Sequence, residues 1–261
     1  MIVEYFLMHK NIHSGIILVD SVSGSLLRFK PLIQEHTPFL GRATEDLMKK
    51  WWQARAIPGT RRDLQNILRD AGCETNLEYM AKNLALSLTD TYWICPADLK
   101  LSWEQVNLYS RQSMNEIVTL HNASSYDPDA TLGGQMDKYW DMGGSAPVLV
   151  KSAYRDYGQQ SLNEEFATLV HSRQAHSVPY VQYKTERSPD GGVVSKCDAF
   201  TRDDLEFVSA YECVNSEKQR KSESLYENYI AICIRHGIDS AIIQQYMDYQ
   251  TLIDRKSTRL N

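Results

Sequence analysis

The order of its hydrophobic patterns constrains this chain most, because strand patterns come before helical patterns in each half. Apolar and polar residues alternate over residues 1–33, and helical spacing follows from about residue 44. Short β-branched runs begin after residue 131, and helical spacing dominates from residue 225. Strands grouped before helices are typical of an α+β fold. We therefore expect a β-rich lobe that leads into a helical lobe.

Changes in composition divide the chain into four parts. Residues 1–95 form a β-then-helical region, residues 96–130 a connection, and residues 131–254 a second unit. Residues 255–261 break an apolar helical pattern with a polar, basic string, which favours a non-native tail. The pattern thus predicts that the chain is a fragment of a longer protein.

Capping residues, glycines and prolines set the expected element boundaries. Thr44, Thr60 and Asn76 are the expected N-caps of the first three helices, and Gly72 is expected to follow the second. The expected helices cover residues 44–57, 61–71, 77–84, 161–174, 225–236 and 241 onward. Beyond residue 131, the expected strands lie around 139–140 and over 148–151, 178–183 and 193–200, with turns at 143–144 and 189–192.

Composition and charge exclude several classes of protein. The chain has 261 residues, of which 43% are hydrophobic and 23% charged, as in ordinary globular proteins. A formal net charge of -5 makes direct nucleic-acid binding a poor expectation. No apolar run approaches the roughly 18 residues that a membrane span needs, and the N-terminus does not match a signal peptide. Five scattered cysteines without a C-x-x-C pair favour reduced thiols, so we expect a cytoplasmic protein. Since no apolar run is long enough to span a bilayer, we expect no membrane partner.

Lys151 is the first candidate for a functional side chain. It ends the apolar run Val148–Lys151, which follows the glycine pair Gly143–Gly144. A lysine in that position can place its ammonium over phosphates that backbone N–H groups also contact. The alternative is an ordinary strand-end lysine whose ammonium reaches solvent.

Glu164, near the start of the next expected helix, is the natural partner for Lys151. In protein kinases a helix glutamate pairs with a strand lysine and holds it at the nucleotide phosphates. Ser161 and Glu164 also match a capping box, which needs no function. Glu165 competes for the role of ion-pair partner, and the apolar spacing of the helix leaves both open.

Other chemical motifs are weaker. The pairs Gly133–Gly134 and Gly143–Gly144 could let the backbone approach a phosphate, although most such pairs are simple turns. The sequence has no G-x-x-x-x-G-K-[ST], G-x-G-x-x-G, H-E-x-x-H or G-x-S-x-G motif. His9 and His13 are four residues apart in a strand region, where that spacing does not form a metal pair. We therefore expect no metal ligands within this chain.

The Trp51–Arg61 segment combines aromatic, basic, proline and glycine residues. One interpretation is a site for a partner, or for an anion at the following helix N-terminus. The other is that the tryptophans pack in the core while the arginines meet nearby carboxylates.

Taken together, residues 1–254 resemble HipA-type serine/threonine protein kinases, in particular the Firmicute HipA-domain or excisionase-family type. The segments that carry the resemblance are Met8–Ile12, Trp51–Arg61, Leu86–Ile94, Trp103–Asn107, Thr131–Gly134, Lys138–Trp140, Leu149–Lys151, Asn163–Glu164 and Val178–Tyr180.

The resemblance implies a two-lobed, protein-kinase-like fold that uses ATP and magnesium and phosphorylates an unknown protein substrate. Lys151 would contact phosphate, Glu164 would orient it, and the glycine-rich segment with Gly143 and Gly144 would cover the nucleotide. The chain departs from the family after Asp254, where the N-x-D-R-H-x-x-N catalytic loop has no counterpart. The helical lobe would then be incomplete, without catalytic or metal-binding residues, and the fragment inactive.

Two other functions remain open at this stage. One is a non-enzymatic, kinase-like interaction or regulatory module of a toxin–antitoxin or mobile-element system. The other is a plain α+β structural domain.

Overall fold

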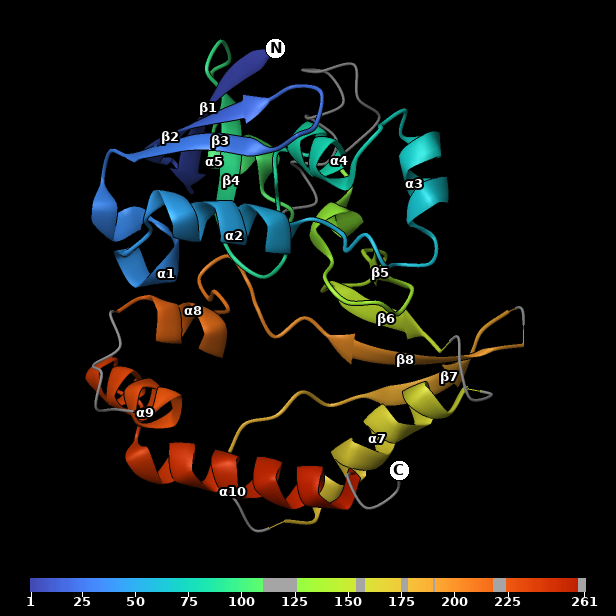
Figure 1. Ribbon diagram of the computed structural model, residues 1–261. Helices are drawn as coiled ribbons and strands as arrows, with labels where there is room; N and C mark the ends of the chain where they lie inside the picture. Colours follow the sequence, from blue (N-terminus) through green and yellow to red (C-terminus); the bar gives the residue numbers. More distant parts are fainter. Residues whose placement is uncertain (110–125, 154–157, 175–177, 190, 218–223, 258–261) are drawn as a thin grey trace.

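Two four-stranded antiparallel sheets, with helices packed around them, make up the part of the chain that the structure describes (Figure 1). The computed structural model describes residues 1–109, 126–153, 158–174, 178–189, 191–217 and 224–257. This arrangement confirms the prediction of an α+β fold. Within these residues no helix is long and apolar enough to cross a membrane.

The first sheet has the strand order β3-β2-β1-β4. Its strands are β1 (Ile2–His9), β2 (Ile12–Asp20), β3 (Leu26–Pro31) and β4 (Tyr92–Pro96). The first three form the meander that the alternation over residues 1–33 predicted. The fourth strand returns to pair with β1 after a helical excursion, so that Leu7 lies opposite Ile94.

Helices follow the first three strands and pack around this sheet and one another (Figure 1). They are η1 (Gln34–His36), α1 (Pro38–Gly41), α2 (Glu45–Arg55), α3 (Leu64–Asp70) and α4 (Asn76–Lys82), and after β4 come α5 (Trp103–Val106) and η2 (Pro128–Thr131). Thr44 caps α2 as predicted, since its hydroxyl accepts a hydrogen bond from the Leu47 amide at 3.3 Å. Gly72 follows α3 in the left-handed conformation, with φ of +61°.

Two predicted N-caps are wrong. The α3 helix begins at Leu64 with Asp63 at the N-cap, so the expected start after Thr60 is three residues too early. Thr75 caps α4 through the Glu78 amide, whereas the Asn76 side chain donates to the Ile57 carbonyl at 2.6 Å. In the second case a tertiary contact takes up the side-chain amide of Asn76.

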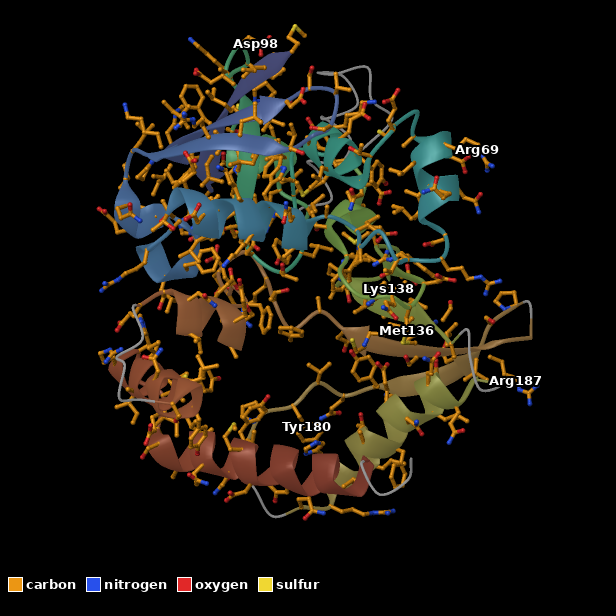
Figure 2. All side chains as sticks on the ribbon, viewed as in Figure 1. Arg69, Asp98, Met136, Lys138, Tyr180 and Arg187 are labelled. Atoms are coloured by element: carbon orange, nitrogen blue, oxygen red, sulfur yellow. The ribbon has the colours of Figure 1, made fainter. Side chains whose placement is uncertain are left out.

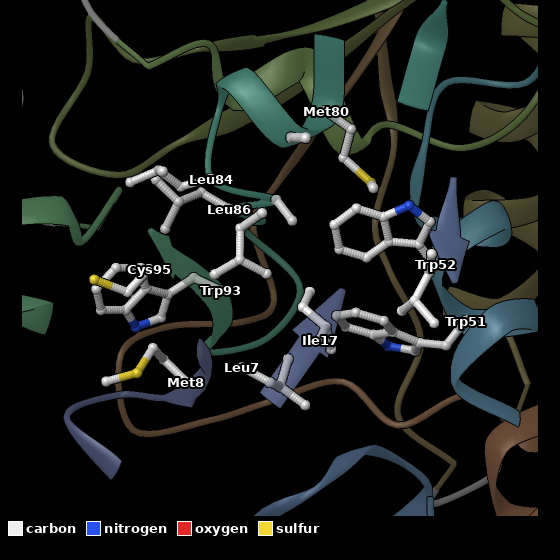
Figure 3. Close-up of a cluster of buried hydrophobic side chains, with 14 of the residues drawn as sticks. Leu7, Met8, Ile17, Trp51, Trp52, Met80, Leu84, Leu86, Trp93 and Cys95 are labelled. Atoms are coloured by element: carbon white, nitrogen blue, oxygen red, sulfur yellow. The ribbon is translucent and has the colours of Figure 1, made fainter. Parts of the chain in front are cut away.

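Tryptophans fill the core between the first sheet and its helices. Trp52 and Trp93 are fully buried, and they pack with Leu7, Ile17 and Met80 (Figure 3). Each indole N–H also finds a backbone acceptor, Gly24 O for Trp52 and Lys10 O for Trp93. Burial of large aromatic surface together with a satisfied N–H is strongly stabilising. The prediction that the tryptophans of the Trp51–Arg61 segment belong to the core is confirmed, since Trp51 and Trp52 are both buried.

Arg55 at the end of α2 makes a buried ion pair with Asp90. The guanidinium donates to both Asp90 carboxylate oxygens, at 2.7 and 2.8 Å, and their side chains are only 5% and 13% exposed. It also donates to the carbonyls of Ala85 and Tyr92 at 2.7 Å. Arg55 thereby holds residues 84–92, a segment in which Leu84 and Ala85 both have positive φ. The predicted pairing of an arginine with a carboxylate is confirmed here.

The second sheet has the strand order β5-β6-β8-β7 and one helix, α7, packed against it. The elements are β5 (Lys138–Asp141), β6 (Val148–Ser152), α7 (Gln159–Ser172), β7 (Lys184–Arg187) and β8 (Val193–Asp198). The predicted hairpin around Gly143–Gly144 forms, and the predicted turn before Val193 joins β7 to β8. The predicted strand over 178–183 is wrong, because this segment runs without sheet pairing until Lys184. Residue 190 of the second turn lies outside the described residues.

Three helices end the described chain: α8 (Ala210–Asn215), α9 (Leu225–Arg235) and α10 (Ser240–Ser257). They lie on the side of the molecule away from the first sheet, and α10 runs toward α7 (Figure 1). On α10, Ile243 is buried but Tyr246 is 41% exposed, so its apolar face is only partly covered. The α10 helix continues three residues beyond Asp254, and the rest of the predicted tail, 258–261, lies outside the described residues.

Replacement of Arg55 by alanine should destabilise the protein by about 3–5 kcal/mol, because Asp90 is left buried without its counter-charge. The matched control is Lys49→Ala, which breaks the exposed pair between Lys49 and Glu45 on the same helix. That change should cost no more than about 0.5 kcal/mol. Urea denaturation monitored by tryptophan fluorescence measures both, and similar losses in the two variants would contradict the role of Arg55.

Candidate functional site

The structure brings Lys151 and Glu164 together. Lys151 lies on β6 and Glu164 on α7, and Nζ of the lysine donates to Oε1 of the glutamate at 2.8 Å. The two side chains are 15% and 25% exposed, so the pair is largely removed from solvent while remaining open at one side. Partial burial strengthens such a pair relative to a surface salt bridge.

Ser195 completes the glutamate's hydrogen bonding. It lies opposite Lys151 on the neighbouring strand β8, and its buried hydroxyl donates to Oε2 of Glu164 at 2.5 Å. Each oxygen of the carboxylate therefore has a donor. The carboxylate is held in one orientation toward the lysine.

The alternatives left open for this helix are resolved by the contacts. Glu165 accepts a hydrogen bond from Thr185 on β7, so it faces a different strand from Lys151. The capping box is wrong, because α7 begins after Gly158 and Ser161 lies inside the helix, donating to the Val193 carbonyl. Sequence spacing alone did not reveal this, because α7 begins at Gln159, two residues before the expected start at Ser161.

Tyr183 is a member of the site that the sequence did not single out. Its hydroxyl accepts a hydrogen bond from Lys151 Nζ at 2.6 Å, and the same nitrogen lies 4.3 Å from the centre of its ring. Burial raises the pKa of Tyr183, so the hydroxyl stays protonated. Tyr183 belongs to the unpaired segment that precedes β7, and no local pattern marks such a residue as a neighbour of Lys151.

The loop containing Gly133 and Gly134 lies beside the end of the β5–β6 hairpin at which Lys151 is found. Lys138 lies opposite Lys151 in the hairpin register, and its Nζ donates to the Gly133 carbonyl at 2.7 Å. From the other side, the buried Arg61 donates to the carbonyls of Leu132, Gly133 and Gly134. Arg61 was expected to meet a carboxylate, but its hydrogen bonds go to these three carbonyl oxygens.

Three cationic groups therefore gather around this glycine loop: Arg61, Lys138 and Lys151. Burial, together with the positive charges of Arg61 and Lys151, lowers the pKa of Lys138 to about 8. Burial also raises the pKa of nearby Asp129 to about 7, which weakens its ability to compensate the cations at neutral pH. A bound anion such as a phosphate would relieve this repulsion. Figure 2 labels Lys138 on the edge strand of the second sheet, on the side toward the first sheet.

Gly143 and Gly144 lie at the opposite end of the hairpin. The register pairs Asp141 with Val148 next to the turn and Lys138 with Lys151 at the far end. Lys138 and Asp141, at these two ends, are three positions apart along β5, which corresponds to about 10 Å. The Gly143 amide donates to the Asp141 carboxylate at 2.9 Å, which stabilises the turn. Nucleotide binding by Gly143, Gly144, Lys151 and Glu164 stays a prediction.

No group of three or more His, Cys, Asp or Glu side chains in the described ranges has an arrangement that could hold a metal ion. A scan against protein-family models, a search of curated proteins and a search of solved structures each found no match to this chain. The interpretation of the site therefore depends on its own geometry.

Lys138 should titrate with a pKa of about 8, well below the ordinary lysine value of about 10.4. The folded chain then releases this proton before the unfolded chain does, so the free energy of unfolding should rise with pH between these values. NMR of ¹³C-methylated lysines measures the titration directly. Lys151→Met removes one neighbouring charge and should raise the pKa; a Lys138 resonance that titrates near pH 10.4 would contradict the charge cluster.

Proposed function

We propose that this chain is the nucleotide-binding part of a HipA-like, ATP-dependent serine/threonine protein kinase. The observation that carries the proposal is the ion pair between Lys151 and Glu164, closed at 2.8 Å and buttressed by Ser195 and Tyr183. In protein kinases a strand lysine paired with a helix glutamate must be in place for catalysis. The ammonium of Lys151 would contact the phosphates, with Glu164 fixing its position.

The order of elements supports the proposal. The lysine strand β6 is followed by the glutamate helix α7, and then by a hairpin whose second strand, β8, pairs beside the lysine strand. This topology brings Ser195 next to Lys151 and lets the helix glutamate reach both. The second sheet with α7 would be the nucleotide-binding lobe, and the helices α8, α9 and α10 would begin the second lobe of a kinase-like fold.

The cations around the glycine loop also fit a nucleotide. Lys138 and Arg61 hold the Gly133–Gly134 loop next to Lys151, and burial together with the charges of Arg61 and Lys151 lowers the pKa of Lys138. Charge-assisted hydrogen bonds from lysines to phosphate are stronger than those between neutral groups. The hairpin glycines Gly143 and Gly144 would then form the outer part of the nucleotide cover.

In the complete kinase, magnesium would neutralise charge on the transferred phosphoryl group. The residues of this chain bind and orient the nucleotide: Lys151 at the phosphates, Glu164 behind it, and the glycine loop around them. An N-x-D-R-H-x-x-N catalytic loop does not occur in the sequence. We therefore propose nucleotide binding without phosphoryl transfer for this chain.

Lys151→Ala should abolish binding of ATP, or weaken it at least about tenfold, because it removes a charge-assisted phosphate contact. Glu164→Gln should weaken binding less, since the lysine keeps its charge but loses its orientation. Lys196→Ala is the control, because Lys196 lies on the same sheet and pairs with Glu186 instead. Isothermal titration with MgATP measures all three, and undiminished binding in Lys151→Ala would refute the assignment.

The purified chain, residues 1–261, should show no metal-dependent autophosphorylation. Phosphoryl transfer needs a group that positions the nucleophile and ligands that hold the metal, and no such motif is in the sequence. Incubation with γ-³²P-ATP and magnesium tests this. Incorporation of label above that of the Lys151→Ala variant would show that the chain carries its own catalytic residues.

A further inference from the structure

A second cluster of titratable side chains lies outside the Lys151 site, in a pocket between β1, η1 and the loop 201–208. The pocket is lined by His9, His36, Thr91, Glu206 and the acidic residues Asp203 and Asp204. It brings together three segments that are distant in the sequence. The two histidines face each other across it.

His9 is fixed in this pocket from two sides. Its Nε2 lies 3.0 Å from Oε1 of Glu206, and its ring stacks on Tyr92 at 4.5 Å between centroids. Glu206 in turn accepts hydrogen bonds from the amide and the hydroxyl of Thr91. Because a carboxylate oxygen accepts, Nε2 of His9 carries the proton that it donates to Glu206.

This tautomer leaves Nδ1 of His9 as a lone-pair donor, and that atom lies 3.2 Å from Nδ1 of His36. Two imidazole nitrogens at this separation need one proton or one cation between them. Two bonds of about 2.0–2.1 Å to a tetrahedral zinc ion place their nitrogens about 3.3–3.4 Å apart. The observed spacing is close to this value.

We propose that His9 and His36 form a two-histidine clamp for a divalent transition-metal ion of the Zn²⁺ or Ni²⁺ type. Imidazole nitrogens select such ions over Mg²⁺ and Ca²⁺, which prefer oxygen ligands. Glu206 supplies the outer contact that a metal-binding histidine usually makes, since its carboxylate orients the ring from the opposite nitrogen. This inference is independent of the proposed nucleotide site.

The remaining coordination positions would be filled by water. The described residues offer no third His, Cys, Asp or Glu with suitable geometry, and Asp203 pairs with Lys10 at 3.8 Å. On binding, the cation replaces the proton shared by the two Nδ1 atoms, and His36 carries its proton on Nε2 instead. Such an open site exchanges its metal readily, unlike a closed structural site with four protein ligands.

Metal binding at this clamp would tie three segments together. His9 ends β1, His36 belongs to η1, and Glu206 belongs to the loop that follows the second sheet. The ion would stabilise the contact between the first sheet and this loop. Binding to the folded state alone raises stability in proportion to the logarithm of metal concentration.

Isothermal titration of the full chain with NiCl₂ and with ZnCl₂ at pH 7.5 tests the proposal. The chain should bind one Ni²⁺ that His36→Gln removes, and Glu206→Gln should weaken this binding about 10–100-fold. His13→Gln is the control, because His13 is an exposed histidine of β2 that contacts Phe6 instead. Circular dichroism establishes that each variant is folded.

The thermal midpoint of the wild-type chain, measured with and without NiCl₂, is the second readout. It should rise with the metal and fail to rise in His36→Gln. Equal Ni²⁺ binding by wild type and His36→Gln, or no binding by the wild type, would overturn the clamp. In that case a shared proton alone joins the two histidines.

Discussion

The buried guanidinium of Arg55 is the interaction on which the arrangement of the molecule depends. It makes four hydrogen bonds, two to Asp90 and two to the carbonyls of Ala85 and Tyr92. These contacts hold a segment with two consecutive positive-φ residues, a conformation that costs energy outside glycine. The planar fork of arginine suits this task, because a lysine has only three N–H donors and could not make all four hydrogen bonds.

The segment that Arg55 holds, residues 84–92, contacts the chain both before and after the second sheet. The Leu86 carbonyl accepts a hydrogen bond from Thr131, which precedes the glycine loop. The Thr89 carbonyl accepts one from the Phe207 amide at 2.7 Å, and Thr91 binds Glu206. The second sheet is thus anchored at both of its chain ends to one segment of the first unit. The Lys151 site and the histidine pocket both depend on this anchor.

Stability and function make opposite demands at the glycine loop. Three cations close together repel one another, and this repulsion adds to burial in lowering the pKa of Lys138. Clusters of this kind, in which burial and neighbouring charge shift a pKa, are typical of sites that bind a charged ligand. The cluster of cations therefore gives a stronger physical argument for a phosphate site than the glycine pair alone does.

The sequence by itself determined the α+β class, the Gly143–Gly144 hairpin, the turn before β8 and most helices, because periodicity and glycine conformation act over a few residues. It also placed Lys151 and Glu164 in neighbouring elements. Only the tertiary structure decided that Glu164 rather than Glu165 faces the lysine, and that Tyr183 and Ser195 complete the pair. Strand register and helix rotation set those contacts, and they depend on packing between distant segments. For the same reason His9 and His36, separated by 27 positions, meet only in the folded chain.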